Sequence, residues 1–345
     1  MKRSTTGRAA VAATALAFVL AGCGSGGSNT ASGSSSGGAK PTVNVQLMEF
    51  SGQSYRVPVA IAQQQGYFKN AGINLTIVEQ PANLQGAQAL TATHSQVGVL
   101  STGTFTQGFQ AGIPVKLFCG GINVLQTSLV ALPDSNLPTS SDGKDWQSVL
   151  KALDGKKIGI QTPVGSGLQL VFAAALKEAG VTNVTYVNLG GAPTAIQAAL
   201  QNHSVDVAQA NPPGTQTLLA NKVAKQLIYM PQGPSAYKDN YGSGFVAPND
   251  WLSSNADAAK GFCDALTKAN TYIADSKNAD KVTQVISTET GVPANVAKDV
   301  VPTFQDFSTK LDNARLQKTF DNYTQLGILK PEPKVTTDAV VWKAP

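Results

Sequence analysis

Residues 153–180 read LDGKKIGIQTPVGSGLQLVFAAALKEAG, which gives a turn, a strand, a short loop and a helix in direct succession. The apolar run at 158–161 is typical of a buried strand. Ser166 and Gln169 have the spacing of a capping box, which marks the start of a helix. Five apolar residues then recur with the period of one buried helix face, namely Leu168, Phe172, Ala175, Leu176 and Ala179. Gly180 is a natural left-handed end to that helix.

The loop at 162–166 leaves unpaired backbone N–H groups at the start of the helix. Such a terminus carries a partial positive charge and can hold a small anion or a carbonyl group. The alternative is that the turn binds nothing, as most turns of α/β proteins do. A dinucleotide site is not indicated, because its fingerprint needs a glycine at 170, where Leu170 stands.

Strands and helices alternate on both sides of this stretch. We expect strands at 43–47, 73–78, 97–100, 114–118, 158–161, 184–189 and 205–208, with helices between them. Alternation of this kind indicates parallel βαβ units, so the sequence predicts an α/β fold. The strands and helices after residue 153 repeat the plan of those before it, so we expect two lobes. Each lobe is expected to be a mostly parallel sheet flanked by helices.

A faint internal repeat supports two similar lobes. When the chain is shifted by 109 residues, positions 74–95 align with 183–204 and seven of the 22 residues are identical, including both histidines, His94 and His203. The lobes are therefore predicted to be two copies of one topology. Both histidines would lie in turns before strands, at the end of the sheet away from a cleft, and we interpret them as surface residues.

The predicted boundaries place lobe 1 at 41–132 and 244–345, and lobe 2 at 133–243. Segment 133–153, rich in Pro, Ser, Asp and Gly, is interpreted as the connection between lobes, and 237–249 as the return crossing. The rest of the chain should be helical and pack onto lobe 1. Its apolar faces are formed by Ala258, Phe262, Ala265, Leu266, Ala269 and Ile273, and by Leu316, Phe320, Tyr323 and Leu326.

The N-terminus indicates export. Basic residues at 2, 3 and 8 precede an apolar run at 9–21 that is too short to span a bilayer as a helix. The box Leu20-Ala21-Gly22-Cys23 resembles the bacterial lipoprotein signal, which implies cleavage before Cys23 and a lipid on its sulfur. Residues 1–22 are then a signal peptide, and 23–40 a lipidated cysteine and a flexible Gly/Ser tether. The protein would be anchored at the outer face of the bacterial cytoplasmic membrane.

Charge and cysteines narrow the function class. The net charge of +5 falls to +2 once the three basic residues of the signal are removed (5 − 3 = 2), and no basic cluster indicates nucleic-acid binding. After Cys23, only Cys119 and Cys263 remain, as a disulfide or as two buried thiols. Neither lies near a histidine in the sequence, and no HExxH or CxxC spacing occurs, so we predict no enzyme, no metal and no cofactor.

Three motifs together resemble a known family. They are Gly66-Tyr67-Phe68-Lys69-Asn70-Ala71-Gly72-Ile73, then Ala111-Gly112-Ile113-Pro114-Val115-Lys116, and Leu153-Asp154-Gly155-Lys156-Lys157-Ile158 followed by the Gly-Ser loop. In this order they are similar to the SsuA/THI5-like (NMT1) substrate-binding proteins of ABC importers for nitrate, sulfonates, taurine and thiamine-pyrimidine precursors. The resemblance runs from about Val43 to Leu329.

The resemblance implies a two-lobed periplasmic-binding-protein type II fold with two crossovers between lobes. A monomer would close on its ligand by a hinge motion and dock on the ABC permease in the membrane. Ligand-binding residues are expected at the carboxyl ends of the strands. On this chain they are Phe50, Ser51, Tyr55, Ser101, Thr102, Thr104, Thr162, Val164, Gly165, Ser166, Asn211, Pro212, Tyr241 and Gly242.

The ligand is expected to be a small anionic or planar compound, such as a sulfonate, nitrate or carboxylate. Where many family members have an acid or Trp before a proline, this chain has Asn211-Pro212, which argues against an amine. Arg56 either pairs with an acidic ligand or is a solvated residue at a helix start. Phe50 and Tyr55 either stack on a ligand or belong to the core. Other functions left open are an aminopyrimidine-type binder, a ligand sensor for a membrane receptor and a carboxylate-based hydrolase.

Overall fold

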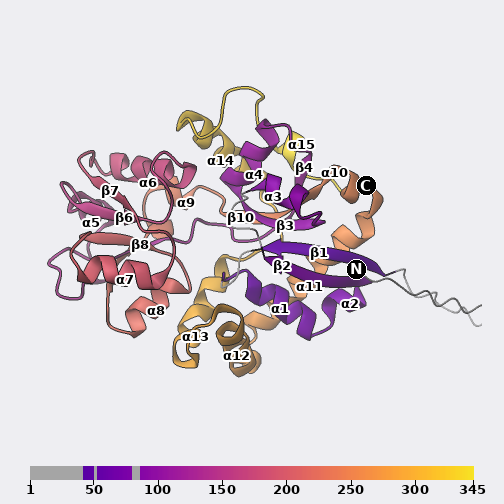
Figure 1. Cartoon of the computed structure of the whole chain (residues 1–345), viewed down its shortest axis with the longest axis horizontal. Coiled ribbons are helices and arrows are strands. Elements are labelled where there is room, and N and C mark those ends of the chain that lie inside the picture. Colours follow the sequence, from indigo (N-terminus) through magenta and orange to yellow (C-terminus); the bar gives the residue numbers. More distant parts are fainter. Residues whose placement is uncertain (1–41, 50–52, 80–85) are drawn as a thin grey trace, which may run out of the picture. The chain divides into compact units, whose positions relative to one another are not determined.

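The computed structural model describes residues 42–49, 53–79 and 86–345, and residues 41–345 form one compact unit. The signal peptide, Cys23 and the tether lie outside the described residues. Within the described ranges, no helix combines the length and the apolar character needed to cross a bilayer. The unit contains two five-stranded sheets, each with helices packed beside it (Figure 1).

The sheet of lobe 1 has the order β2-β1-β3-β10-β4. Its strands are β1 Val43–Glu49, β2 Ile73–Glu79, β3 Val97–Ser101, β4 Val115–Gly120 and β10 Ser243–Pro248. The helices between them are α1 Arg56–Gln64, α2 Tyr67–Asn70, α3 Ala87–Ala92 and α4 Thr102–Gln110. Strand β10 is antiparallel to both of its neighbours, while β1, β2 and β3 are parallel. The predicted mostly parallel sheet is confirmed.

The sheet of lobe 2 has the order β7-β6-β8-β5-β9. Its strands are β5 Ser128–Ala131, β6 Lys157–Ile160, β7 Thr185–Asn188, β8 Val207–Ala210 and β9 Lys225–Tyr229. Its helices are η1 Ser140–Asp142, α5 Trp146–Lys151, α6 Gly167–Glu178, α7 Pro193–Gln201, α8 Gly214–Ala220, η2 Met230–Gln232 and α9 Ser235–Lys238. Strand β5 is antiparallel to β8 and β9, as β10 is to β3 and β4.

The two sheets therefore share one topology, and the internal repeat marks its matching parts. Positions 74–95 cover β2, α3 and the turn before β3, and positions 183–204 cover β7, α7 and the turn before β8. His94 and His203 both have a left-handed backbone, with φ of 52° and 53°, and both are exposed. Histidine is one of the residues that tolerate this conformation. Their predicted place at the amino ends of β3 and β8 is confirmed.

The predicted crossing from lobe 1 to lobe 2 was placed too late in the chain. The short strand β5 already belongs to the second sheet, so the crossing lies at 121–127 and not at 133–153. Segment 133–153 instead packs within lobe 2, where Ser135 O accepts a hydrogen bond from Lys225 Nζ and Ser140 Oγ donates to Leu227 O at 3.2 Å. Its polar composition resembles a linker, but these bonds fix it to β9.

The two crossings lie directly against each other. Ser243 N donates to Ile122 O at 2.9 Å, and a Cβ atom at Gly242 would clash with the carbonyl oxygens of Ile122 and Val124. Only glycine allows so close a backbone approach at 242. The return crossing enters β10 at Ser243, one residue from the predicted boundary.

The C-terminal helices cover lobe 1 as predicted. They are α10 Asn249–Ser254, α11 Ala256–Ala274, η3 Ser276–Asn278, α12 Ala279–Thr290, α13 Ala294–Val300, η4 Val301–Asp306, α14 Asn313–Gln325 and α15 Thr337–Val340. On α11, Phe262 has its ring centroid 5.1 Å from that of Phe68 and 5.2 Å from that of Phe245, so it joins α2 and β10 in one core. All six predicted core residues of α11 are buried. Of the four predicted on the last long helix, the three on α14 are buried and Leu326, directly after α14, is half-buried.

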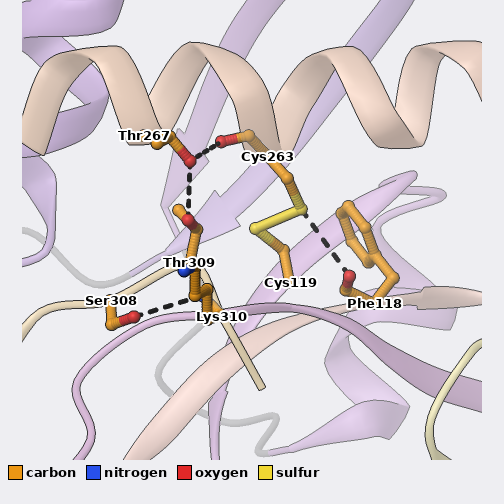
Figure 2. The surroundings of a disulfide bond; sticks show 7 residues. All are labelled: Phe118, Cys119, Cys263, Thr267, Ser308, Thr309 and Lys310. Atoms are coloured by element: carbon orange, nitrogen blue, oxygen red, sulfur yellow. Dashed lines mark hydrogen bonds between the residues drawn. A yellow bond between two sulfur atoms is a disulfide. The ribbon is translucent and has the colours of Figure 1, made fainter.

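The structure joins Cys119 and Cys263 in a disulfide, which is one of the two alternatives that the sequence left open (Figure 2). Their Cα atoms are 5.7 Å apart, and the bond links the end of β4 to α11. Beside it, Thr267 Oγ1 donates to Cys263 O at 2.9 Å and lies 2.6 Å from Thr309 Oγ1. The disulfide thus fastens lobe 1 at the point where the chain leaves it for lobe 2.

Candidate ligand-binding cleft

A cavity of about 790 Å³ lies between the carboxyl ends of the strands of the two lobes. Its lining includes Ser101 at the end of β3, Gln161 directly after β6, Asn211 directly after β8 and Gly242 in the return crossing. Open α/β sheets bind ligands at this edge, because loops and helix starts converge there. The volume falls in the range of pockets that enclose a small molecule.

Half of the predicted binding residues line this cavity. They are Tyr55, Ser101, Thr104, Thr162, Asn211, Pro212 and Gly242. Phe50 and Ser51 lie outside the described residues. The other five, Thr102, Val164, Gly165, Ser166 and Tyr241, are not part of the lining.

Burial explains where three of those five side chains lie. Thr102 is buried, and its backbone N–H donates to Gly242 O at 2.9 Å. Tyr241 is buried beneath α14, where its N–H donates to Thr319 Oγ1 at 2.8 Å. Val164 faces solvent with 63% of its surface exposed. Sequence position alone placed these residues beside the cleft without showing which way each side chain points.

Several lining residues were not predicted. The outgoing crossing contributes Ile122, Val124, Leu125, Gln126 and Thr127, because it runs through the cleft rather than around it. The end of α12 contributes Thr290, followed by Val292. Leu168 was predicted to be buried on α6, but it is 41% exposed and lines the cavity. Leu168 lies in the first turn of α6, beside the cavity. Its apolar spacing therefore matched the buried face of the helix although its side chain is partly exposed.

Half of the predicted capping box at the start of α6 is present. Ser166 Oγ accepts from Gln169 N at 3.4 Å, but Gln169 Oε1 accepts from Gly165 N at 2.9 Å, one residue before the cap, while Ser166 N donates to Pro163 O. At the start of α4, Ser101 Oγ accepts from Thr104 N at 3.2 Å. Side chains of the protein itself therefore satisfy backbone donors at both helix starts.

Hydrogen bonds join the crossing to both lobes at the base of the cleft. With its amide nitrogen turned toward the crossing, Asn211 donates to Gln126 O at 2.8 Å and to Thr127 Oγ1 at 3.1 Å. Gln126 Nε2 donates to Thr303 O at 2.7 Å, on the lobe 1 side. Tyr229 OH, at the end of β9, donates to Asp306 Oδ2 at 2.7 Å. Burial, and then this bond to Asp306, raises the pKa of the Tyr229 hydroxyl.

One more polar contact spans the mouth of the cleft. Ser54 Oγ, from the segment before α1, donates to Pro212 O at 3.2 Å, in the segment after β8. The donor belongs to lobe 1 and the acceptor to lobe 2. The contact therefore holds the two lobes together across the cavity that both residues line.

Arg56 is neither a solvated residue nor free to pair with an anion. Its Nη1 lies 2.5 Å from Glu49 Oε1, and its Nε lies 2.9 Å from Glu289 Oε2. Glu49 is fully buried, and desolvation raises the pKa of its carboxyl to about 7, although the Arg56 charge opposes this shift. Both expectations for Arg56 are therefore wrong, because the chain itself supplies two carboxylates for this cation.

Neither histidine and neither cysteine of the described residues lies in the lining of the cavity. Both histidines are exposed at the opposite end of the strands, and Cys119 is bonded to Cys263. Across 42–49, 53–79 and 86–345, no three His, Cys, Asp or Glu side chains are grouped to hold a metal ion. The lining offers an uncharged surface with hydroxyl and amide groups, which is suited to reversible binding.

The comparisons with known proteins agree with this geometry. A family model described as "NMT1/THI5 like" matches residues 53–279. No curated protein sequence gave a significant match. Among solved structures, the alkanesulfonate-binding protein SsuA from Xanthomonas axonopodis pv. citri, bound to MOPS, is similar with a TM-score of 0.67 and 18% identity. The match covers 89% of this chain and 100% of that one.

Two further structures show the same fold. The periplasmic aliphatic sulphonate binding protein SsuA from Escherichia coli has a TM-score of 0.68 and 18% identity, over 88% of this chain and 92% of that one. The periplasmic nitrate-binding protein NrtA from Synechocystis PCC 6803 has a TM-score of 0.63 and 15% identity, over 87% of this chain and 86% of that one. Two lobes, each an α/β unit, are common to these folds.

Proposed function

Because the chain belongs to the NMT1/THI5-like family, we propose that it is an extracytoplasmic solute-binding protein that captures a small molecule between its lobes and delivers it to an ABC importer. The observation that carries the proposal is the cavity of about 790 Å³ at the carboxyl ends of both sheets. Solved structures of sulfonate- and nitrate-binding proteins with the same fold support the assignment.

The lipid anchor is part of the proposal. The Leu20-Ala21-Gly22-Cys23 box and the basic, apolar leader before it support attachment through Cys23. A lipid at Cys23 and the Gly/Ser tether that follows it would keep the binding unit close to a permease in the same membrane. The protein would act as a monomer, with no cofactor and no nucleic-acid partner.

The ligand class proposed from the sequence is a small anionic or planar compound. The test is thermal unfolding of the purified full chain against nitrate, taurine, alkanesulfonates, aromatic carboxylates and aminopyrimidines. A ligand specific for the native state adds about 2.7 kcal/mol of stability at a hundred times its dissociation constant, which gives a readily measured rise in Tm. A flat response to every class would remove these solutes from the proposal.

Two further measurements separate the alternative functions. Mass spectrometry of the bound compound after release shows whether it is returned unchanged, as a binding protein requires, or converted, as a hydrolase requires. Uptake of the labelled compound by cells that carry or lack the gene separates an importer subunit from a receptor's sensor. Binding without any loss of uptake in the deletion strain would favour the sensor.

A further inference from the structure

We propose that the cleft is built for an uncharged ring compound with an amide-like edge, rather than for a sulfonate, nitrate or carboxylate anion. The inference rests on the proposed solute-binding function and narrows its ligand class. Four features of the described residues carry it, namely the chemistry of the lining, the capped starts of α4 and α6, the paired arginine and the apolar side chains in the lining.

Every side chain that lines the cavity in the described part of the chain is uncharged. The polar ones are hydroxyls and carboxamides, and the carboxamides come from Gln53, Gln126, Gln161 and Asn211. A carboxamide presents a donor and an acceptor side by side, which complements a lactam, an imide or another carboxamide.

Two of the helix starts at the cavity, those of α4 and α6, already have internal partners, whereas α7 begins after Ala192 in the lining without a side-chain cap. Gly165 N donates to Gln169 Oε1 at 2.9 Å, and Gln169 N donates to Ser166 Oγ at 3.4 Å. Thr104 N donates to Ser101 Oγ at 3.2 Å in the same way. At these two helix starts an anion would compete with the caps for the N–H groups of Thr104 and Gln169, which reduces its gain there.

The guanidinium of Arg56, beside the cleft, is already paired within the protein. Arg56 follows Tyr55, which lines the cavity, but its guanidinium contacts the carboxylates of Glu49 and Glu289. Two carboxylates around one guanidinium leave no excess positive charge to attract an anion. Binding a sulfonate through Arg56 would leave the buried Glu49 without its partner, which is costly for a group that is fully buried.

Both lobes contribute apolar side chains to the lining. Leu168 lines it from lobe 2 with 41% of its surface exposed, and Val99 and Leu100 line it from lobe 1. A flat ring beside them would cover the exposed leucine, and its edge would meet Gln53 or Gln161, because the amide of Asn211 is already bonded to the crossing. Pockets that bind small molecules typically combine apolar walls with a few polar groups that fix orientation.

The test uses pairs of compounds that differ in charge but hardly in shape. Calorimetric titration of the purified full chain at pH 7 would compare benzamide with benzoate, nicotinamide with nicotinate, and benzenesulfonamide with benzenesulfonate. In at least one pair we expect the uncharged member to bind and its anion to bind at least tenfold more weakly. Burying an anion against uncharged walls loses hydration that these groups do not replace.

A charge-gain variant gives the internal control. Gln161→Lys places a cation in the lining and should shift the affinity ratio of each binding pair at least tenfold toward the anion. Gln201→Lys makes the same change at an exposed position at the end of α7, away from the cavity, and should leave the ratio unchanged. If Gln161→Lys does not fold, Gln53→Lys introduces the cation from lobe 1 instead.

The possible outcomes separate this inference from the proposed function. Tighter binding of the anion in any pair would overturn the inference and leave the solute-binding function standing. The inference would also be overturned if no uncharged probe bound at 10 mM. The importer function would still be tested separately, by measuring uptake in the deletion strain. A ratio that changes equally in Gln161→Lys and Gln201→Lys would show that net charge, and not the cleft, decides the preference.

Discussion

Replacing Glu49 with glutamine is expected to change how the stability of the protein depends on pH. Glu49 is fully buried at the end of β1, and desolvation raises the pKa of its carboxyl from 4.5 to about 7 despite the paired Arg56. A raised pKa means that the folded state favours the protonated acid. The stability due to this group is therefore complete below pH 4.5 and is lost as the pH rises toward 7.

The magnitude follows from the shift. Each pKa unit corresponds to about 1.4 kcal/mol, so the wild type should lose about 3 kcal/mol in all and roughly 2–3 kcal/mol of this between pH 5 and pH 8. Glu49→Gln cannot ionise and should lack this loss. The free energy of unfolding, measured with urea at pH 5, 6, 7 and 8, should therefore converge on, or rise above, that of the wild type as the pH increases.

The test is how much the free energy of unfolding changes between pH 5 and pH 8 in the wild type and in Glu49→Gln. Loss of the contact with Arg56 lowers the stability of Glu49→Gln by a similar amount at each pH, so it does not affect the difference between pH 5 and pH 8. Glu332→Gln removes the same charge at an exposed position and should follow the wild type at every pH. If the changes in unfolding free energy between pH 5 and pH 8 differ by less than about 0.5 kcal/mol between the wild type and Glu49→Gln, burial does not outweigh the Arg56 charge at Glu49. The reasoning would then be wrong.

Three further predictions concern the disulfide, the close approach of the two crossings and the lipid anchor. Replacing both Cys119 and Cys263 with alanine should lower the free energy of unfolding by about 2–5 kcal/mol in urea titrations, and reductant should then have no further effect. Gly242→Ala should lower it by about 1–3 kcal/mol because its Cβ meets carbonyl oxygens of the other crossing, whereas Gly191→Ala, with open space around it, should not. Cys23→Ala should move the protein from the membrane fraction to the soluble fraction; retention in the membrane would contradict the lipid anchor.

The order of strands and helices could be predicted because its signals are local. The strand and the helix of 153–180 were predicted to within two residues of their observed bounds, and the repeat at a shift of 109 residues identified matching parts of the two sheets. The exceptions among the strands are β5, β9 and β10, which were not predicted. Strands β5 and β9 are short, of four and five residues, and β10 lies in the segment that was interpreted only as the return crossing.

The cleft could be predicted only in part, because its details depend on contacts between distant residues. Arg56 meets Glu289 across 233 positions of sequence, and Ser54 meets Pro212 across 158. No spacing in the sequence reveals either pair. Motifs at strand ends placed Ser101, Asn211 and Gly242 at the cleft, but only the fold shows that Val164 faces solvent and that Leu168 faces the ligand space.

The disulfide also determines how the protein would carry mechanical load. Cys119 and Cys263 are 144 positions apart, and the whole of lobe 2 lies between them in the chain. Both ends of the described unit belong to lobe 1, where Val341 bridges to Leu117. Tension applied between the two ends would pass from β4 through the sulfur bridge into α11 and would bypass lobe 2. Lobe 2 lies within a loop of the chain that the disulfide closes. A pull on the N-terminus would therefore not stretch the segments of lobe 2 that line the cleft.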